Sequence, residues 1–195
     1  MKTPPANTAA GSFEQREEQD MYIHHEDIII RNAVESDSQQ LADWWNDGRV
    51  MAHAGFPLGL GITPQEIAVS LSTDSDDTRR RLIIEHQKKP IGEMNFRNRG
   101  NRTVEIGIKI CDPSYQEKGL GRTVLSLLID ELFGRGYARI TLDTNLNNTR
   151  AQHVYELLGF RKLRVNHDSW TDQLGRLQSS VDYELTADDF HNYAE

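Results

Sequence analysis

The segment Thr103–Leu128, TVEIGIKICDPSYQEKGLGRTVLSLL, decides how the rest of the chain can fold. Its residues 103–111 alternate apolar side chains with charged or small ones, which is the period-two pattern of a strand with one buried face. An Asp-Pro pair ends that strand, and leucine and valine then recur at helical spacing. Gly119 and Gly121 stand between the strand and the helix, so the segment predicts a strand, a glycine loop and a helix in direct succession.

The two glycines can be interpreted in several ways. A phosphate-binding P-loop would need a Lys-Ser or Lys-Thr pair after the glycines, which is absent, and a dinucleotide fingerprint would need a third glycine where Val124 stands. The amides and the positive dipole end of the following helix suit a pyrophosphate, which glycines allow to approach the backbone. A tight strand-to-helix turn without any ligand is an equally open alternative.

The sequence on both sides of this segment predicts an alternation of strands and helices. Strands are expected at residues 28–30, 82–84, 91–96, 138–143, 160–165 and 181–185, and helices at residues 35–47, 63–72 and 148–158. Gly48 is expected to end the first helix, and a Thr63–Glu66 capping box to begin the second. This order predicts an α/β (α+β) fold with a single mixed, mostly antiparallel central sheet flanked by helices.

Length and composition narrow the class of protein. The chain has 195 residues with a formal net charge of −8, which fits one globular domain and opposes a nucleic-acid partner. Residues 1–22 are rich in polar residues and proline and predict a disordered N-terminal tail, so residues 23–195 form the expected single domain. One cysteine, Cys111, excludes an internal disulfide, and no apolar run suits a membrane span or a secretion signal, so we expect a cytoplasmic protein without a membrane partner.

Two motifs resemble a known family. Residues 116–121, QEKGLG, resemble the acetyl-CoA pyrophosphate loop of the GNAT superfamily of N-acetyltransferases, and residues 148–160, NTRAQHVYELLGF, are similar to its Asn-x-x-Ala, Tyr and Gly-Phe segment. Residues 31–47, RNAVESDSQQLADWWND, resemble the branch with ribosomal-protein-alanine, polyamine and aminoglycoside acetyltransferases. The resemblance covers about residues 26–186 and implies a GNAT-like acyl-CoA N-acyltransferase fold.

The resemblance also implies roles for particular residues. The strand before the loop would diverge from its neighbour and pair with the pantetheine arm of acetyl-CoA, the acetyl donor. Tyr155 matches the family's general acid, and Glu105 matches an acidic strand residue that serves as the base in some members. The residues expected to contact acetyl-CoA are Ile110, Cys111, Gln116, Glu117, Lys118, Gly119, Leu120, Gly121, Arg122 and Asn148.

Each of these residues also has a purely structural interpretation. Tyr155 could be a half-buried aromatic residue, Glu105 a solvated or salt-bridged strand residue, and Asn148 a plain helix N-cap. Cys111 is expected to be a small buried hydrophobic residue rather than a nucleophile, because no histidine lies beside it in the sequence. The His24-His25 pair lacks ligands at metal-binding spacing, so no metal is expected.

The function expected from these observations is transfer of the acetyl group of acetyl-CoA to a primary amine. The excess of 30 acidic over 22 basic residues favours a small cationic amine of the polyamine or aminoglycoside type, bound between residues 44–62 and the loop around Trp170. The alternatives are a protein N-terminal acetyltransferase, similar to those acting on ribosomal proteins, or a non-catalytic CoA-binding module. The sequence leaves the oligomeric state open, with a homodimer as one option.

Overall fold

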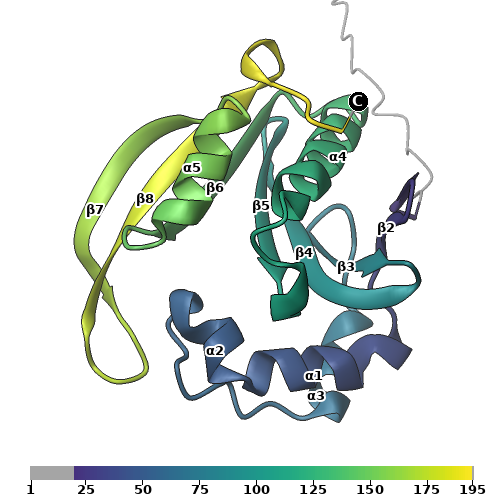
Figure 1. Ribbon diagram of the computed structural model, residues 1–195, viewed down its shortest axis with the longest axis vertical. Helices are drawn as coiled ribbons and strands as arrows, with labels where there is room; N and C mark the ends of the chain where they lie inside the picture. Colours follow the sequence, from purple (N-terminus) through teal and green to yellow (C-terminus); the bar gives the residue numbers. More distant parts are fainter. Residues whose placement is uncertain (1–19, 195) are drawn as a thin grey trace, which may run out of the picture.

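The computed structural model describes residues 20–194, and Figure 1 shows how their elements are arranged. The strands are β1 (Tyr22–His25), β2 (Ile28–Asn32), β3 (Arg79–His86), β4 (Lys89–Gly100), β5 (Thr103–Ile110), β6 (Arg139–Asn145), β7 (Arg161–Thr171) and β8 (Leu177–Thr186). The α-helices are α1 (Ser38–Asn46), α2 (Gly48–Met51), α3 (Pro64–Leu71), α4 (Leu120–Gly134) and α5 (Thr149–Leu157). Short 3₁₀ turns lie at η1 (Glu35–Asp37), η2 (Ala52–Ala54), η3 (Pro113–Tyr115) and η4 (Ala187–Asp189).

The eight strands form one sheet in the order β1-β2-β3-β4-β5-β6-β8-β7. Among the described strands β5 and β6 pair in parallel, and every other neighbouring pair is antiparallel. The parallel pair needs a crossover, which α4 supplies between the two strands. The predicted mixed, mostly antiparallel sheet flanked by helices is therefore confirmed.

The helices cover the two faces of the sheet unequally (Figure 1). Apolar side chains of α4 and α5 pack on one face in a core that includes Val104 and Ile106 of β5. On the other face α1 and α3 cover the N-terminal half of the sheet, in a smaller core with Ile83 and Cys111. Neither core includes a described residue on that second face of β6 and β8, so this part of the sheet is left to polar side chains.

Several local predictions are confirmed at the level of single hydrogen bonds. The Thr63 hydroxyl accepts from the Glu66 amide at 3.3 Å, and the Glu66 carboxylate accepts from the Thr63 amide at 2.8 Å, which is the expected capping box. In β5 the alternation holds, since Val104 and Ile106 are buried while Glu105 is half-buried on the opposite face. Local sequence patterns were sufficient here because every partner lies within a few residues.

Two boundaries were predicted wrongly. The folded part begins before residue 23, because Met21 is 1% exposed in the core and Tyr22 begins β1, while residues 1–19 of the predicted tail lie outside the described part. Gly48 does not end the helical region but begins α2, because the Asp47 carboxylate caps a new turn by accepting from the Arg49 amide at 2.8 Å.

Candidate functional site

The candidate site lies where β5 and β6 diverge. Their parallel pairing covers Thr103–Glu105 with Arg139–Thr141, and beyond these residues the strands separate (Figure 1). The facing edges of β5 and β6 therefore carry backbone amides and carbonyls without ladder partners between these two described strands. The sequence predicted this divergence through its resemblance, and the observed register agrees with it.

The turn after β5 is held by Asp112. Its carboxylate accepts hydrogen bonds from the Ser114 amide at 2.9 Å and the Ser114 hydroxyl at 2.6 Å, and it forms an ion pair with Lys89 at 2.6 Å. The hydrogen bond from Lys89, followed by those from Ser114, lowers the pKa of Asp112 to about 2. The Gln116 side chain then donates to the Ile110 carbonyl at 2.8 Å, which folds the glycine loop back against the end of β5.

The backbone conformation favours a glycine at position 119 but not at position 121. Gly119 has φ +80° at the N-cap of α4, a left-handed conformation that favours glycine. At Gly121 the backbone is not left-handed, and apart from its chain neighbours and its own helix backbone no atom lies within 4 Å of where a Cβ would stand. Nothing in the described part of the protein therefore requires a glycine at position 121, and the space beside it suits a ligand that approaches the backbone.

The other predicted loop residues surround the same helix N-terminus. Lys118 lies 6.0 Å from the centre of the Tyr115 ring, and the Arg122 guanidinium lies 4.3 Å from the Tyr193 ring. The Nε atom of Arg122 is buried without a hydrogen-bond partner among the described residues. Two cationic side chains and the first turn of a helix thus suit an anionic ligand. Glu117 and Leu120 lie in the same loop, with Glu117 at φ +60°.

Helix α5 is connected to this loop. The Asn148 side chain accepts from the Ala151 amide at 3.4 Å and donates to the Thr144 hydroxyl at 3.3 Å, so Asn148 caps its helix. Arg150, in the first turn of α5, forms an ion pair with Glu117 at 2.9 Å. The N-cap interpretation of Asn148 is therefore confirmed, and its contact with acetyl-CoA stays a prediction.

Tyr155 is fixed in place by aromatic neighbours. Its ring packs edge-on against Phe160 and Tyr183, with centroids 5.9 and 5.8 Å away, and the residue is 7% exposed. No residue among 20–194 forms a hydrogen bond with its hydroxyl. Burial, followed by the negative charge of Asp143, raises the pKa of Tyr155 to about 12, so the phenol stays protonated at neutral pH. Tyr155 thus combines a core ring with an uncommitted hydroxyl that can donate a proton.

Glu105 lies at the last paired position of β5, beside the divergence. Its carboxylate accepts from Arg99 at 2.6 and 3.1 Å, which is the salt-bridged alternative that the sequence left open. It points to the face opposite α4, and its role as the base stays a prediction.

Cys111 is the buried hydrophobic residue that the sequence predicted. It is 3% exposed, and burial raises the pKa of its thiol, so the reactive thiolate is disfavoured. Its amide donates to the Ile91 carbonyl at 2.9 Å, toward β4 and away from the divergence. The Ile110 carbonyl already accepts from Gln116. A pantetheine partner at the end of β5 would therefore use backbone groups other than these two, or displace Gln116.

A buried polar network centred on Glu93 was not predicted from the sequence. The Glu93 carboxylate of β4 is buried and accepts from the Trp45 indole at 2.8 Å and from the Lys109 ammonium at 3.0 Å. These bonds connect α1 to β4 and β5 and satisfy an otherwise costly buried charge. Only the sheet register brings Glu93 opposite Lys109, so no local pattern could have indicated it.

A long-range contact closes the side of the site away from the glycine loop. The Gln173 side chain donates to the Gly59 carbonyl at 2.9 Å and accepts from the Leu58 amide at 2.9 Å, while the Gln173 amide donates to the Gly55 carbonyl at 2.8 Å. The Trp170 ring packs against Gly55, where a Cβ would lie 2.4 Å from a ring carbon. We call this contact the hairpin clasp. It joins the β7-β8 hairpin to the predicted acceptor-binding segment 44–62.

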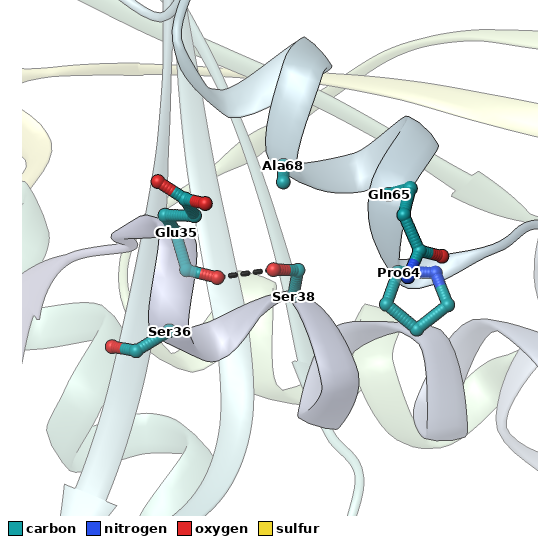
Figure 2. Close-up of a pocket in the computed structure, with 6 residues that line it drawn as sticks. All are labelled: Glu35, Ser36, Ser38, Pro64, Gln65 and Ala68. Atoms are coloured by element: carbon teal, nitrogen blue, oxygen red, sulfur yellow. Dashed lines mark hydrogen bonds between the residues drawn. The ribbon is translucent and has the colours of Figure 1, made fainter.

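A hollow lies elsewhere on the protein, away from these residues. Figure 2 shows a shallow groove between the start of α1 and the start of α3, where the Ser38 hydroxyl donates to the Glu35 carbonyl. The groove is lined by Glu35, Ser36, Ser38, Pro64, Gln65 and Ala68. It has one titratable side chain and none of the predicted site residues, so we assign it no role in the chemistry.

Two features are absent from the described residues. Among residues 20–194, no group of three or more histidine, cysteine, aspartate or glutamate side chains could hold a metal ion. In the same part of the chain, no helix has the length and apolar character needed to cross a membrane.

The sequence was compared with known families and curated proteins. The model of the acetyltransferase (GNAT) family matches residues 60–160. The [ribosomal protein bS18]-alanine N-acetyltransferase of Escherichia coli (strain K12) is 42% identical over 65 residues, which cover 33% of this chain and 44% of that protein. The chain therefore spans less than half the length of the curated relatives that it matches.

The fold was compared with solved structures. A spermidine N-acetyltransferase from Vibrio cholerae, in complex with CoA and spermine, aligns with a TM-score of 0.73 at 23% identity, covering 84% of this chain and 97% of that chain. The ribosomal L7/L12 alpha-N-protein acetyltransferase RimL, in complex with coenzyme A, aligns with a TM-score of 0.76 at 17% identity, covering 87% and 99%. At these identities the likeness shows a shared fold.

Proposed function

Because this chain belongs to the acetyltransferase (GNAT) family, we propose that it transfers the acetyl group of acetyl-CoA to a primary amine. The observation that carries the proposal is the divergence of β5 from β6 immediately before a glycine loop at the N-terminus of α4. The open strand edge suits the amide-rich pantetheine arm, and the helix N-terminus suits the phosphates.

The loop fits the phosphates of acetyl-CoA in two respects. The open space at Gly121 lets an anion reach the backbone amides of residues 117–122. Lys118 and Arg122 add positive charge at the same helix end. The residues present therefore suit a pyrophosphate, and the strand edge from Ile106 to Ile110 would hold the arm that carries the acetyl thioester.

The chain's own residues can handle the proton transfers of the reaction. A protonated amine loses one proton before its nitrogen bonds to the acetyl carbon and a second as the amide forms, while the thiolate released when the carbon–sulfur bond breaks gains one, so one proton is released overall. In our proposal Tyr155 donates the proton to the thiolate, supported by its raised pKa and its uncommitted hydroxyl. Glu105 accepts the proton from the amine, after its carboxylate exchanges a hydrogen bond with Arg99 for one with the amine or with water.

For the acceptor we propose a small cationic amine of the polyamine or aminoglycoside type. The net charge of −8 favours attraction of such a molecule, and the hairpin clasp encloses the expected acceptor side. A peptide N-terminus is the second candidate, because the curated relative with 42% identity over 65 residues acts on a ribosomal protein alanine.

Release of free thiol from acetyl-CoA tests the proposal directly. The purified chain would be incubated with acetyl-CoA and, separately, with spermidine, kanamycin or an alanine-initiated peptide. Amine-dependent thiol release with the cationic small molecules, decreasing as salt rises, is the expected result. Efficient release with the peptide alone would favour the second candidate, and acetyl-CoA binding without release for any amine would indicate a non-catalytic CoA-binding module.

A further inference from the structure

The segment that follows β8 runs back to α4, as the yellow trace in Figure 1 shows. The Phe190 ring packs against Phe133 near the end of that helix, with centroids 5.9 Å apart. Farther along the segment the Tyr193 amide donates to the Ser126 hydroxyl at 3.0 Å, about two helical turns closer to the start of α4. We call residues 190–194 the strap. These two contacts lay the strap along α4 in the direction of the glycine loop.

Ser126 fixes the strap on the helix. The residue is 0% exposed and lies in the buried part of α4, where its buried neighbours Val124 and Leu125 are apolar. A buried hydroxyl needs a hydrogen-bond partner, and the amide of Tyr193 provides one. Arg122 precedes Ser126 by four positions, so the two side chains lie on one face of α4, and the strap reaches both of them.

The partner of Arg122 on this face is an aromatic ring. The Arg122 guanidinium lies over the Tyr193 ring, 4.3 Å from its centroid. Within residues 20–194 the Arg122 side chain forms no ion pair and no hydrogen bond, although its Nε atom is buried. A chain with a net charge of −8 thus leaves this arginine, in the first turn of α4, without a carboxylate partner in the described part.

An aromatic ring holds a guanidinium in a different way from a carboxylate. A carboxylate takes up the N–H groups and offsets the charge, as Glu117 does for Arg150 in the neighbouring ion pair. A ring contacts the flat face of the guanidinium, keeps its charge and leaves the N–H groups at its edge available. Phosphate oxygens are well suited to accept from these N–H groups in pairs. Arg122 is therefore ordered, charged and unpaired at the helix end where we propose that the phosphates of acetyl-CoA bind.

We propose that Tyr193 is a positioning residue for acetyl-CoA, because its ring holds the Arg122 guanidinium ready to bind a phosphate group. This inference rests on the proposed function and adds a residue that lies outside both motifs resembling the GNAT family. Since Arg122 is already ordered before the donor binds, binding costs less side-chain entropy. The ring acts on the affinity for the phosphates and takes no part in the transfer of the acetyl group.

The test compares Tyr193→Leu with Tyr193→Phe, which keeps the ring. Tyr193 is 38% exposed, so both variants should unfold at temperatures close to that of the parent. Calorimetric titration should give a Kd for acetyl-CoA that is about three- to tenfold higher in Tyr193→Leu, because a long side chain must then be ordered on binding. In Tyr193→Phe the Kd should stay within about twofold of the parent's, because the cation–π contact is kept.

The same substitution at another exposed tyrosine is the control. Tyr22→Leu, on the edge strand β1, should leave the Kd for acetyl-CoA unchanged. A parent that binds acetyl-CoA, with an equal Kd in Tyr193→Leu or with equal losses in Tyr193→Leu and Tyr193→Phe, would overturn the inference and leave the proposed function standing. A parent that does not bind acetyl-CoA would contradict both.

A double-mutant cycle separates positioning from a purely structural role. In the Arg122→Met background, Tyr193→Leu should leave the Kd for acetyl-CoA within about twofold of that of Arg122→Met alone, because the guanidinium that the ring holds is absent. If the ring only supported the fold, its loss would weaken binding by the same factor in both backgrounds. Equal factors would therefore overturn the inference.

Discussion

Removing the hydroxyl of Tyr155 should separate catalysis from folding. In Tyr155→Phe the ring keeps its contacts with Phe160 and Tyr183, and no hydrogen bond to a described residue is lost. The free energy of unfolding should therefore change by less than about 1 kcal/mol. Turnover should fall by roughly 10²-fold or more, equivalent to about 2.7 kcal/mol in the activation free energy, because the general acid is gone.

The chain offers a matched control in Tyr183→Phe. The Tyr183 hydroxyl donates to the Glu156 carboxylate at 3.0 Å, so this variant should lose about 1 kcal/mol of stability and keep the parent's turnover. Thiol release measures turnover, equilibrium titration measures acetyl-CoA affinity, and urea unfolding measures stability. If Tyr155→Phe keeps turnover within a factor of two of the parent, Tyr155 is a core residue only and our reasoning about its hydroxyl is refuted.

Three further predictions concern the loop, the hairpin clasp and alkaline stability. Gly121→Val should weaken acetyl-CoA binding by more than tenfold while the unfolding temperature stays near that of the parent, because a Cβ at this position meets no atom outside its chain neighbours and its own helix backbone; an unchanged Kd would contradict the phosphate loop. Gln173→Ala removes two hydrogen bonds of the hairpin clasp, so it should raise the KM for the acceptor and leave the Kd for acetyl-CoA unchanged. Equal effects on the KM and on the Kd would contradict a role of the hairpin clasp in binding the acceptor. The folded pKa of Tyr155, about 12, exceeds the unfolded value near 10, so its contribution to stability is complete below pH 10 and is lost as pH rises toward 12. The unfolding temperature should therefore fall less between pH 9 and pH 11 in Tyr155→Phe than in the parent, and parallel curves would contradict this assignment.

The fold could be predicted from the sequence wherever its signals are local. The alternation in residues 103–111, the Thr63–Glu66 capping box and the glycines before α4 each depend on partners a few residues away. Such patterns indicate which backbone conformation is favoured and which face of a helix or strand is apolar. They were sufficient to predict every described strand except β1, the main helices and the mixed character of the sheet.

Charge partners could not be predicted in the same way. Glu105 and Arg99 are six residues apart on different strands, and the ion pair forms because the hairpin between β4 and β5 brings them together. The sequence therefore left Glu105 open between a base and a salt-bridged residue. Strand β1 as a whole was also missed, since four residues beside a polar tail show too little periodicity to indicate a strand, and the burial of Met21 depends on distant elements.

The sequence by itself determined the loop and the candidate acid, because residues 116–121 and Tyr155 belong to contiguous motifs whose local conformation positions them. Only the tertiary structure decided what surrounds them. The parallel register of β5 and β6 places Glu105 opposite Thr141 at the point where the strands diverge, and the hairpin clasp joins Gln173 to Gly59 across 114 positions of the chain. The physical reason is that strand order and register depend on burying apolar faces from the whole chain at once, and the polar side chains on the opposite faces come together as a consequence.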